Sequence, residues 1–138
     1  MNKPYISDQA YAQFLREEKI MGSQCGSCGV LAVPPRSICG DCYQTQLNWI
    51  EFKGRGTLAA FTFIAIGAPF MIAQGYDRNN PYCTAVIKLD EGPRIVARLE
   101  EVDATQPESL QIGVVVQAKF LHYKAASESK TSLVFTPV

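Results

Sequence analysis

Four of the five cysteines form two Cys-x-x-Cys pairs, and this spacing is the strongest chemical signal in the sequence. The pairs are Cys25 with Cys28 and Cys39 with Cys42. Two such pairs, each on a tight turn, can bring four thiolates around one metal ion in a tetrahedron. Glycine permits the backbone angles that such turns need, and glycines lie beside both pairs: Gly26, Gly29 and Gly40. The sequence therefore predicts a metal site.

Disulfide bonds and a thioredoxin-type redox pair are the competing interpretations of these cysteines. A redox site uses one such motif at the start of a helix in a βαβ unit, whereas this sequence has two motifs and no βαβ pattern. Four cysteines leave no coordination position for water or substrate, so we expect a structural site. Zinc is the expected metal, and rubredoxin-like iron, which could carry electrons, stays open because it would use the same ligands. Zinc would contribute on the order of 10 kcal/mol to folding, so this region should be unfolded without metal.

Length and charge limit the classes of protein that remain. The 138 residues suffice for one domain with a small appendage, and 13 basic residues balance 13 acidic ones. This balance argues against a nucleic-acid surface, because phosphate contacts dominate such binding. Charged residues make up 19% of the chain, against about 25% in an average globular protein. With 47% apolar content, this low charge suggests that another subunit covers part of the surface.

The sequence carries no signal for a membrane or for secretion. The first residues, 1–13, lack a basic stretch followed by an apolar run, and no segment approaches the apolar length of a membrane span. Cysteines in metal spacing fit a reducing compartment, so we expect a soluble, cytoplasmic protein. The fifth cysteine, Cys83, lies in the alternating run 82–89, and we expect it to be a small buried apolar side chain rather than a nucleophile.

The elements that hold the cysteines follow from the pattern of apolar residues. Ser7 or Asp8 can begin a helix that runs to about Lys19, and its single apolar stripe could pack on this chain or on a partner. The metal hairpin follows, over residues 21–43. Beyond it, branched and aromatic residues predict strands at 47–52, 57–66, 82–89, 95–99, 114–123 and 131–135, with a helical turn at 107–110.

A long loop at residues 67–81 interrupts the strands. It carries the apolar side chains of Phe70, Met71, Ile72 and Tyr76, and long loops of this kind are often binding elements. Five or six strands of these lengths, closed on themselves, form an OB-type barrel. We therefore expect a mainly β protein with an N-terminal helix in residues 1-20, a rubredoxin-like zinc ribbon in residues 21-45 and an OB-fold β-barrel in residues 46-138.

The order of motifs resembles one known family across nearly the whole chain. After a leading helix, the two cysteine pairs flank a Val-Pro-Pro-Arg element, and three further motifs follow: Gly54-Arg55-Gly56-Thr57, Asp90-Glu91-Gly92-Pro93-Arg94 and Ile112-Gly113. The cysteines alone are common to many ribbons. In this order with the other motifs, they resemble the zinc-ribbon plus OB-fold proteins catalogued as domain of unknown function thirty-five.

This resemblance implies a role as an accessory subunit. Members of the family associate with enzymes that act on acyl-coenzyme A thioesters, including thiolases, condensing enzymes, hot-dog-fold hydratases and aldolases. The resemblance implies that the OB barrel helps to house or bridge coenzyme A and that the ribbon helps to dock the partner. We therefore expect a non-catalytic subunit that binds acyl-CoA and docks onto an acyl-CoA-processing enzyme, with a thiolase as the first candidate and an enoyl-CoA hydratase or aldolase as the alternative.

The residues agree that catalysis lies elsewhere. The single histidine, His122, lies on an alternating strand, and no Ser-His-acid or Cys-His set forms around it. The acidic residues Glu100, Glu101 and Asp103 lie at a strand end, where solvated charge is the ordinary explanation. We expect no turnover by this chain alone.

Candidate coenzyme A contacts are cations next to aromatic residues. Lys53 and Arg55 flank a glycine turn that leads to Phe61 and Phe63, which suits phosphates beside an amphipathic arm. Arg36 in the ribbon and Arg94 after the hairpin turn are secondary candidates. Each of these residues can equally be an ordinary turn or edge residue.

Two other functions compete with the acyl-CoA subunit. OB barrels and zinc ribbons occur in nucleic-acid-binding proteins, and Phe61, Phe63 and Tyr82 could stack on the bases of a single strand. The zero net charge argues against this function. The third possibility is an electron carrier with iron at the cysteines, which the colour of the purified protein would reveal.

Overall fold

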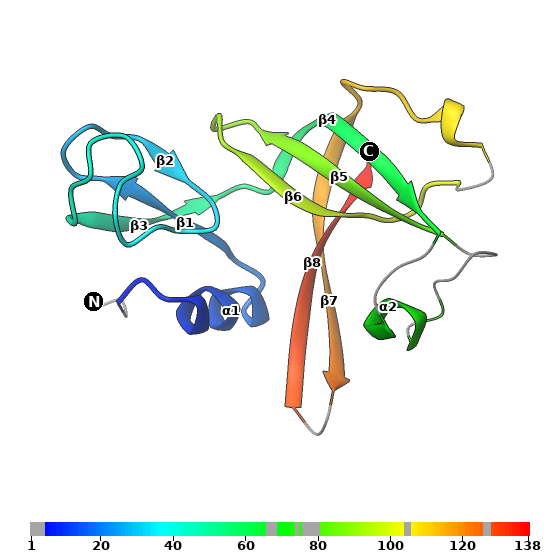
Figure 1. Cartoon of the computed structure of the whole chain (residues 1–138), viewed down its shortest axis with the longest axis horizontal. Coiled ribbons are helices and arrows are strands. Elements are labelled where there is room, and N and C mark those ends of the chain that lie inside the picture. Colours follow the sequence, from blue (N-terminus) through cyan, green and yellow to red (C-terminus); the bar gives the residue numbers. More distant parts are fainter. Residues whose placement is uncertain (1–4, 66–68, 74, 76–80, 104–105, 126–127) are drawn as a thin grey trace.

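A helix, a small sheet and a closed β-barrel follow one another along the chain (Figure 1). The computed structural model describes the chain except for residues 1–4, 66–68, 74, 76–80, 104–105 and 126–127. This architecture confirms the predicted fold class: mainly β, with an N-terminal helix, a ribbon that carries the four cysteines, and a barrel of the OB type.

The N-terminal helix α1 spans Asp8–Arg16 and packs on its own chain. The Ser7 side chain accepts a hydrogen bond from the Ala10 amide at 3.1 Å, which satisfies one of the free amides at the helix start. Phe14 meets Trp49 edge to face, with ring centroids 5.0 Å apart. The helix ends before the predicted Lys19, because Glu18 adopts a left-handed conformation with φ 61°.

The ribbon is a three-stranded antiparallel sheet with the order β2-β1-β3. Its strands are β1 at Ile20–Cys25, β2 at Leu31–Ala32 and β3 at Leu47–Phe52. Strand β3 has the predicted bounds, but it pairs with β1 along its whole length, from Ile20 opposite Phe52 to Cys25 opposite Leu47. The strand expected to open the barrel therefore completes the ribbon. The predicted domain limits remain a prediction.

The barrel closes in the order β4-β5-β6-β8-β7, with β4 hydrogen-bonded to β7. All neighbouring strands are antiparallel except β6 and β8, which run parallel at the residue pairs Arg98 with Val134 and Leu99 with Phe135. The bounds are Arg55–Ile64 for β4, Tyr82–Leu89 for β5, Arg94–Leu99 for β6, Val115–Ala125 for β7 and Glu128–Pro137 for β8. A 3-10 turn, η1 at Pro107–Ser109, precedes β7 and agrees with the predicted turn at residues 107–110.

Strands β7 and β8 are longer than the sequence pattern indicated. They form a two-stranded hairpin that projects beyond the barrel (Figure 1). A β-bulge between Leu58 and Ala60 shifts the register of β4, so that Phe61 and Phe63 pack against the core. Of the loop predicted at residues 67–81, a short helix α2 at Pro69–Ala73 is described. Tyr76 lies outside the described residues, so the binding role expected of this loop stays a prediction.

One hydrophobic core joins the barrel to the ribbon. Its barrel residues are Leu58, Cys83, Ala85, Ile87, Leu89, Ile95, Leu99, Val116 and Phe135. Ile20, Val33 and Phe52 from the ribbon belong to the same cluster. Cys83 is 1% exposed, and burial raises the pKa of its thiol to about 11. This finding confirms that Cys83 is a small buried side chain.

The junction between ribbon and barrel is fixed by backbone contacts at Gly54. Its carbonyl accepts hydrogen bonds from the Ala118 amide at 2.7 Å and from the Gln117 side chain at 3.1 Å. The preceding amide, of Lys53, donates to a carboxylate oxygen of Glu91 at 2.9 Å. Gly54 has φ 81°, and a Cβ atom there would lie 2.8 Å from the Cβ of Ala118. Only glycine fits this position without strain.

None of the helices in the described ranges is long and apolar enough to cross a membrane.

Candidate functional site

The four paired cysteines converge on one point between the two turns of the ribbon. The sulfurs of Cys25, Cys28, Cys39 and Cys42 all lie within 4.8 Å of one another. The sulfur atoms of Cys25 and Cys42 are 3.5 Å apart, and those of Cys28 and Cys39 are 3.6 Å apart. Tetrahedral zinc with Zn–S bonds of about 2.3 Å requires S···S separations of roughly 3.8 Å. The cluster therefore has the size that a zinc ion needs.

Backbone amides point at the sulfur of the first cysteine in each pair. The amides of Ser27 and Cys28 donate to Cys25 Sγ at 3.4 and 3.5 Å, and the amide of Asp41 donates to Cys39 Sγ at 3.4 Å. Such N–H···S bonds stabilise thiolates and orient the ligands around a metal. Cys25 and Cys39 are also buried, with 2% and 1% of their surfaces exposed, so these two sulfurs are held in place by packing as well.

The two cysteine turns have the same backbone path. In the first turn the Gly29 amide donates to the Cys25 carbonyl at 3.0 Å, and in the second the Tyr43 amide donates to the Cys39 carbonyl at 3.1 Å. Gly29 and Tyr43 are also both left-handed, with φ 79° and 62°. The residue that corresponds to Gly29 is thus Tyr43 rather than Gly40, and the second turn places a tyrosine where the first has a glycine.

The thiol pKa values in the cluster divide into two classes. Hydrogen bonds from the amides of Cys28 and Ser27 lower the pKa of Cys25 to about 6. Hydrogen bonds from the backbone amides of Cys42 and Asp41 lower the pKa of Cys39 in the same way. A hydrogen bond with the backbone of Val30 favours the thiolate of Cys28. Its contact with the Cys39 sulfur and its desolvation favour the thiol, and together with its other sulfur contacts they raise the pKa of Cys28 to about 12. A metal cation would stabilise all four groups as thiolates.

These observations fit a structural zinc site. Four thiolate donors in tetrahedral spacing match the soft-ligand preference of zinc and fill all of its coordination positions. Bound zinc would tie β1 to the two turns and would leave no position for a reacting molecule. The arrangement of the sulfurs fits rubredoxin-like iron equally well, because both metals take the same four ligands.

The coenzyme A candidates lie in three separate places. Lys53 and Arg55 are exposed at the ribbon junction, where Arg55 Nε lies 3.9 Å from a carboxylate oxygen of Asp90. Phe61 and Phe63 lie further along β4, with ring centroids 5.9 Å apart, and both pack against the core. Six residues separate Arg55 from Phe61, which is roughly 20 Å along a strand. Arg36 is exposed in the ribbon. The structure brings Lys53 close to Arg55 and Phe61 close to Phe63, but it does not bring the two pairs and Arg36 together. Their role in coenzyme A binding stays a prediction.

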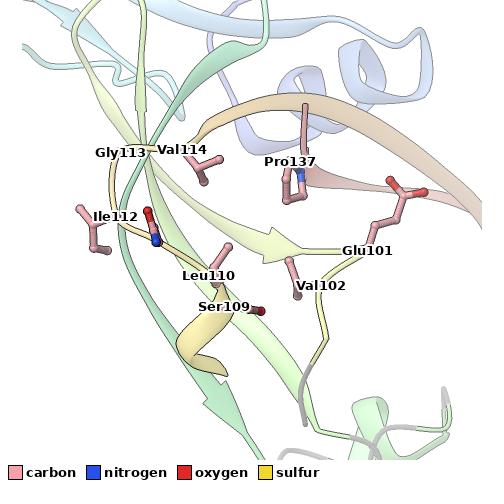
Figure 2. A pocket seen from close by; sticks show the side chains of 9 residues that line it. Glu101, Val102, Ser109, Leu110, Ile112, Gly113, Val114 and Pro137 are labelled. Carbon is pink, nitrogen blue, oxygen red and sulfur yellow. The ribbon is translucent and has the colours of Figure 1, made fainter. Parts of the chain in front are cut away.

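A groove that the sequence did not indicate lies between η1 and the ends of the barrel strands. It encloses about 520 Å³, and Figure 2 shows Val102, Leu110, Val114 and Pro137 around a common space. Glu101 stands at its rim, with a left-handed backbone at φ 60° and its carboxylate 3.9 Å from the Lys119 amine. The lining mixes apolar side chains with the polar side chains of Glu101, Ser109 and Gln111. Its residues come from three distant segments, which no local sequence pattern links.

The single histidine lies beside a hydroxyl on the β7–β8 hairpin. His122 is exposed on β7, and its Nδ1 lies 2.8 Å from the Thr131 hydroxyl on the neighbouring strand. Glu100 forms a 3.0 Å ion pair with Arg98. The Thr131 hydroxyl thus lies within hydrogen-bond reach of a base, but in the described part of the chain no carboxylate contacts His122 to complete an acyl-transfer triad.

Comparison with family models places the chain in one family. Residues 12–47 match the model described as ChsH2, rubredoxin-like zinc ribbon domain, and residues 49–121 match ChsH2, C-terminal OB-fold domain. A DUF35 domain-containing scaffold protein of Methanocaldococcus jannaschii is 32% identical over 106 residues, which are 76% of this chain and 70% of the relative. The protein therefore belongs to the DUF35 family of zinc-ribbon and OB-fold proteins, as the sequence motifs predicted.

Two further comparisons extend this result. A probable enoyl-CoA hydratase alpha subunit of Thermomonospora curvata is 26% identical over 122 residues, which are 88% of this chain but 34% of that protein. The solved structure named Ltp2-ChsH2(DUF35) aldolase superposes with a TM-score of 0.74 at 23% identity, covering 97% of this chain and 98% of the other. At this identity the second match shows the shared fold.

Proposed function

We propose that the protein is a non-catalytic accessory subunit that binds an acyl-CoA thioester and docks onto an acyl-CoA-processing enzyme. The observation that carries this proposal is a zinc-ribbon and OB-barrel chain in a family whose relatives are named scaffold proteins, with no carboxylate on His122 to complete a triad among the described residues. A closed site of four cysteines holds structure and offers no open position for chemistry. Function then depends on what the surface binds.

The partner of this subunit is the least determined part of the proposal. A thiolase is the partner that the family resemblance first implies. The names of two similar proteins favour the alternative, since one is named a probable enoyl-CoA hydratase alpha subunit and the other Ltp2-ChsH2(DUF35) aldolase. Both alternatives place acyl-CoA chemistry on the partner and leave this chain with binding and positioning.

Two features support a binding role for the surface. The exposed apolar side chains on the ribbon include Ile38 and Tyr43, at 54% and 76% exposure, and both lie next to metal-binding cysteines. Apolar groups beside a rigid metal centre make a surface suited to another protein. Cations on the outside of the barrel, Arg55 among them, suit the phosphates of coenzyme A.

Affinity purification of the tagged, zinc-loaded chain from its native host tests the proposal. We expect an acyl-CoA-processing enzyme to co-elute in stoichiometric amount and to carry turnover that the chain alone lacks. Identification of the co-eluting subunit by mass spectrometry distinguishes thiolase from hydratase and aldolase. Co-elution of single-stranded nucleic acid without such an enzyme would support the nucleic-acid function instead, and turnover by the isolated chain would contradict a non-catalytic role.

A further inference from the structure

Two basic residues face each other on the outer surface of the barrel. Lys88 on β5 and Arg94 on β6 are direct cross-strand partners, and both are exposed. Side chains in such pairs start about 5 Å apart, and like charges placed there destabilise a sheet. Within the described ranges of the chain, the structure gives neither residue an ion pair. The pair thus opposes folding to a small extent and is available to an anion.

A third cation extends this pair onto the neighbouring strand. Thr57 on β4 lies opposite Lys88. Arg55 precedes Thr57 by two positions and therefore lies on the same face of the strand. The contact of Arg55 with Asp90 is 3.9 Å long and both side chains are 53% exposed, so it neutralises Arg55 only weakly. Three cations, Arg55, Lys88 and Arg94, therefore gather with the carboxylates of Asp90 and Glu91 at the end of the β5–β6 hairpin that points towards the ribbon, and the cations outnumber the carboxylates (Figure 1).

An apolar row adjoins the cations on the same outer face. Val86 on β5 pairs with Ala60 on β4 and with Val96 on β6, which is 67% exposed. Their sequence neighbours Ile87 and Ile95 are buried in the core, which confirms that the valines face outwards. The exposed Val96 and the half-buried Val86 thus lie beside Lys88 and Arg94, so the surface combines an apolar part with a cationic part. One molecule with an anionic part and an apolar part would complement both.

We propose that Lys88, Arg94 and Arg55 bind the phosphates of an organic phosphate ester whose apolar part lies over Val86 and Val96. The inference rests on the proposed function, in which an acyl-CoA thioester is the ligand, and it moves the phosphate contacts from Lys53 to the two facing cations. An arginine can hold two phosphate oxygens at once, while the lysine supplies a point charge. The row of Ala60, Val86 and Val96 offers no aromatic surface for stacking, which disfavours single-stranded nucleic acid.

Calorimetric titration of the full, zinc-loaded chain tests this site. The titrants are acetyl-CoA and inorganic diphosphate, and the variants are Lys88→Gln and Arg94→Gln. The matched control is Lys130→Gln, which removes an exposed lysine from β8 at a distance from the face. We expect each test variant to weaken acetyl-CoA binding by roughly ten- to a hundredfold, because a charge-assisted contact is lost. We expect the control to bind like the natural chain.

Inorganic diphosphate separates the anion site from the whole ligand. We expect it to bind more weakly than acetyl-CoA and to lose affinity in the same two variants, since it contacts the cations but not the valines. Because neutral glutamine relieves like-charge repulsion, the variants should unfold at the same or slightly higher denaturant concentration than the natural chain. This measurement shows that lost binding does not come from lost folding.

The outcomes distinguish this inference from the proposed function. Equal acetyl-CoA affinity in the natural chain and both variants would overturn the phosphate site while leaving an acyl-CoA subunit intact. Diphosphate binding that depends on Lys88 and Arg94, without acetyl-CoA binding, would support the anion site and count against acyl-CoA as the ligand. Binding of neither titrant would overturn the inference, and the co-purification experiment tests the accessory role independently.

Discussion

Single sulfur atoms determine what the ribbon can hold. Because the four sulfurs lie at tetrahedral spacing, we expect one zinc per chain and its loss in Cys28→Ser, whose hydroxyl is a poor zinc ligand. Elemental analysis of freshly purified protein measures the metal. A zinc content below about half an equivalent, or a red iron-containing sample, would contradict the zinc assignment.

The pKa of Cys25 gives the sign of the pH dependence. Amide hydrogen bonds hold this pKa at about 6, below the ordinary thiol value, so the thiolate is favoured in the folded ribbon. Stability from this group is therefore complete above the ordinary thiol pKa and is lost as pH falls towards about 6. We expect zinc to be retained at neutral pH and released by acid only at a pH below the metal-free value of about 6, because the bound cation lowers the thiol pKa further, measured with a zinc-sensitive dye. Retention that decreases as pH is raised from about 6 to about 8 would contradict this sign.

The matching cysteine turns predict opposite effects of two substitutions. Tyr43 is 76% exposed and left-handed, so Tyr43→Gly should relieve backbone strain at little cost in buried surface and raise the free energy of unfolding by about 1 kcal/mol. Gly29→Ala at the equivalent position should lower it by a similar amount. Denaturation followed by the fluorescence of Trp49, which lies on β3, measures both. If both variants changed the free energy of unfolding in the same direction, the two turns would not be equivalent.

At the scale of elements, the orientation of ribbon and barrel depends on the close approach at Gly54. Gly54→Ala would combine an unfavourable φ with a 2.8 Å contact to Ala118, and we expect it to lower the free energy of unfolding by about 2 to 3 kcal/mol. Gly92→Ala is the matched control, because Gly92 has φ 117° but nothing lies within 4 Å of its added Cβ. Urea denaturation of both variants separates the steric contact from backbone strain. A loss at Gly54 no larger than at Gly92 would exclude the contact as its cause.

Elements with a local pattern were predictable from the sequence. Strand β5 has the predicted bounds because its residues alternate strictly between core and surface. Strand β4 begins two residues before its predicted start because Arg55, Gly56 and Thr57 pair with β7, and its bulge between Leu58 and Ala60 depends on the partner strand in the same way. The pairing of β3 with β1 is a long-range choice that the local sequence of β3 does not contain. The projecting length of β7 and β8 depends in the same way on mutual pairing.

The candidate sites also differ in whether they depend on local sequence or on long-range pairing. The cysteine cluster was predictable because ligand spacing within each turn is local, and the turn sets the geometry. The left-handed conformation of Tyr43 was not predictable, because a tyrosine gives no sign in the sequence that its backbone matches that of Gly29. Lys88 and Arg94 become neighbours only through strand register, so composition and spacing could not join them.

At the scale of the whole molecule, the ribbon and the barrel are coupled through one core. Ile20, Val33 and Phe52 of the ribbon belong to the same buried cluster as the barrel residues. A ribbon that loses its metal would expose these side chains and remove contacts from the barrel as well. We therefore expect zinc to stabilise the barrel indirectly, although no cysteine of the cluster lies in it.

Removal of zinc by a chelator under reducing conditions tests this coupling. We expect Trp49 fluorescence to report loss of order in β3 first, because β3 pairs with the strand that carries Cys25. Zinc binding contributes on the order of 10 kcal/mol in small metal modules, so the ribbon should not persist without it. The barrel should remain folded but less stable, with a lower thermal midpoint by circular dichroism and faster hydrogen exchange in β4 and β7 beside the junction. Unchanged exchange in these strands after complete metal removal would show that the barrel folds independently of the ribbon.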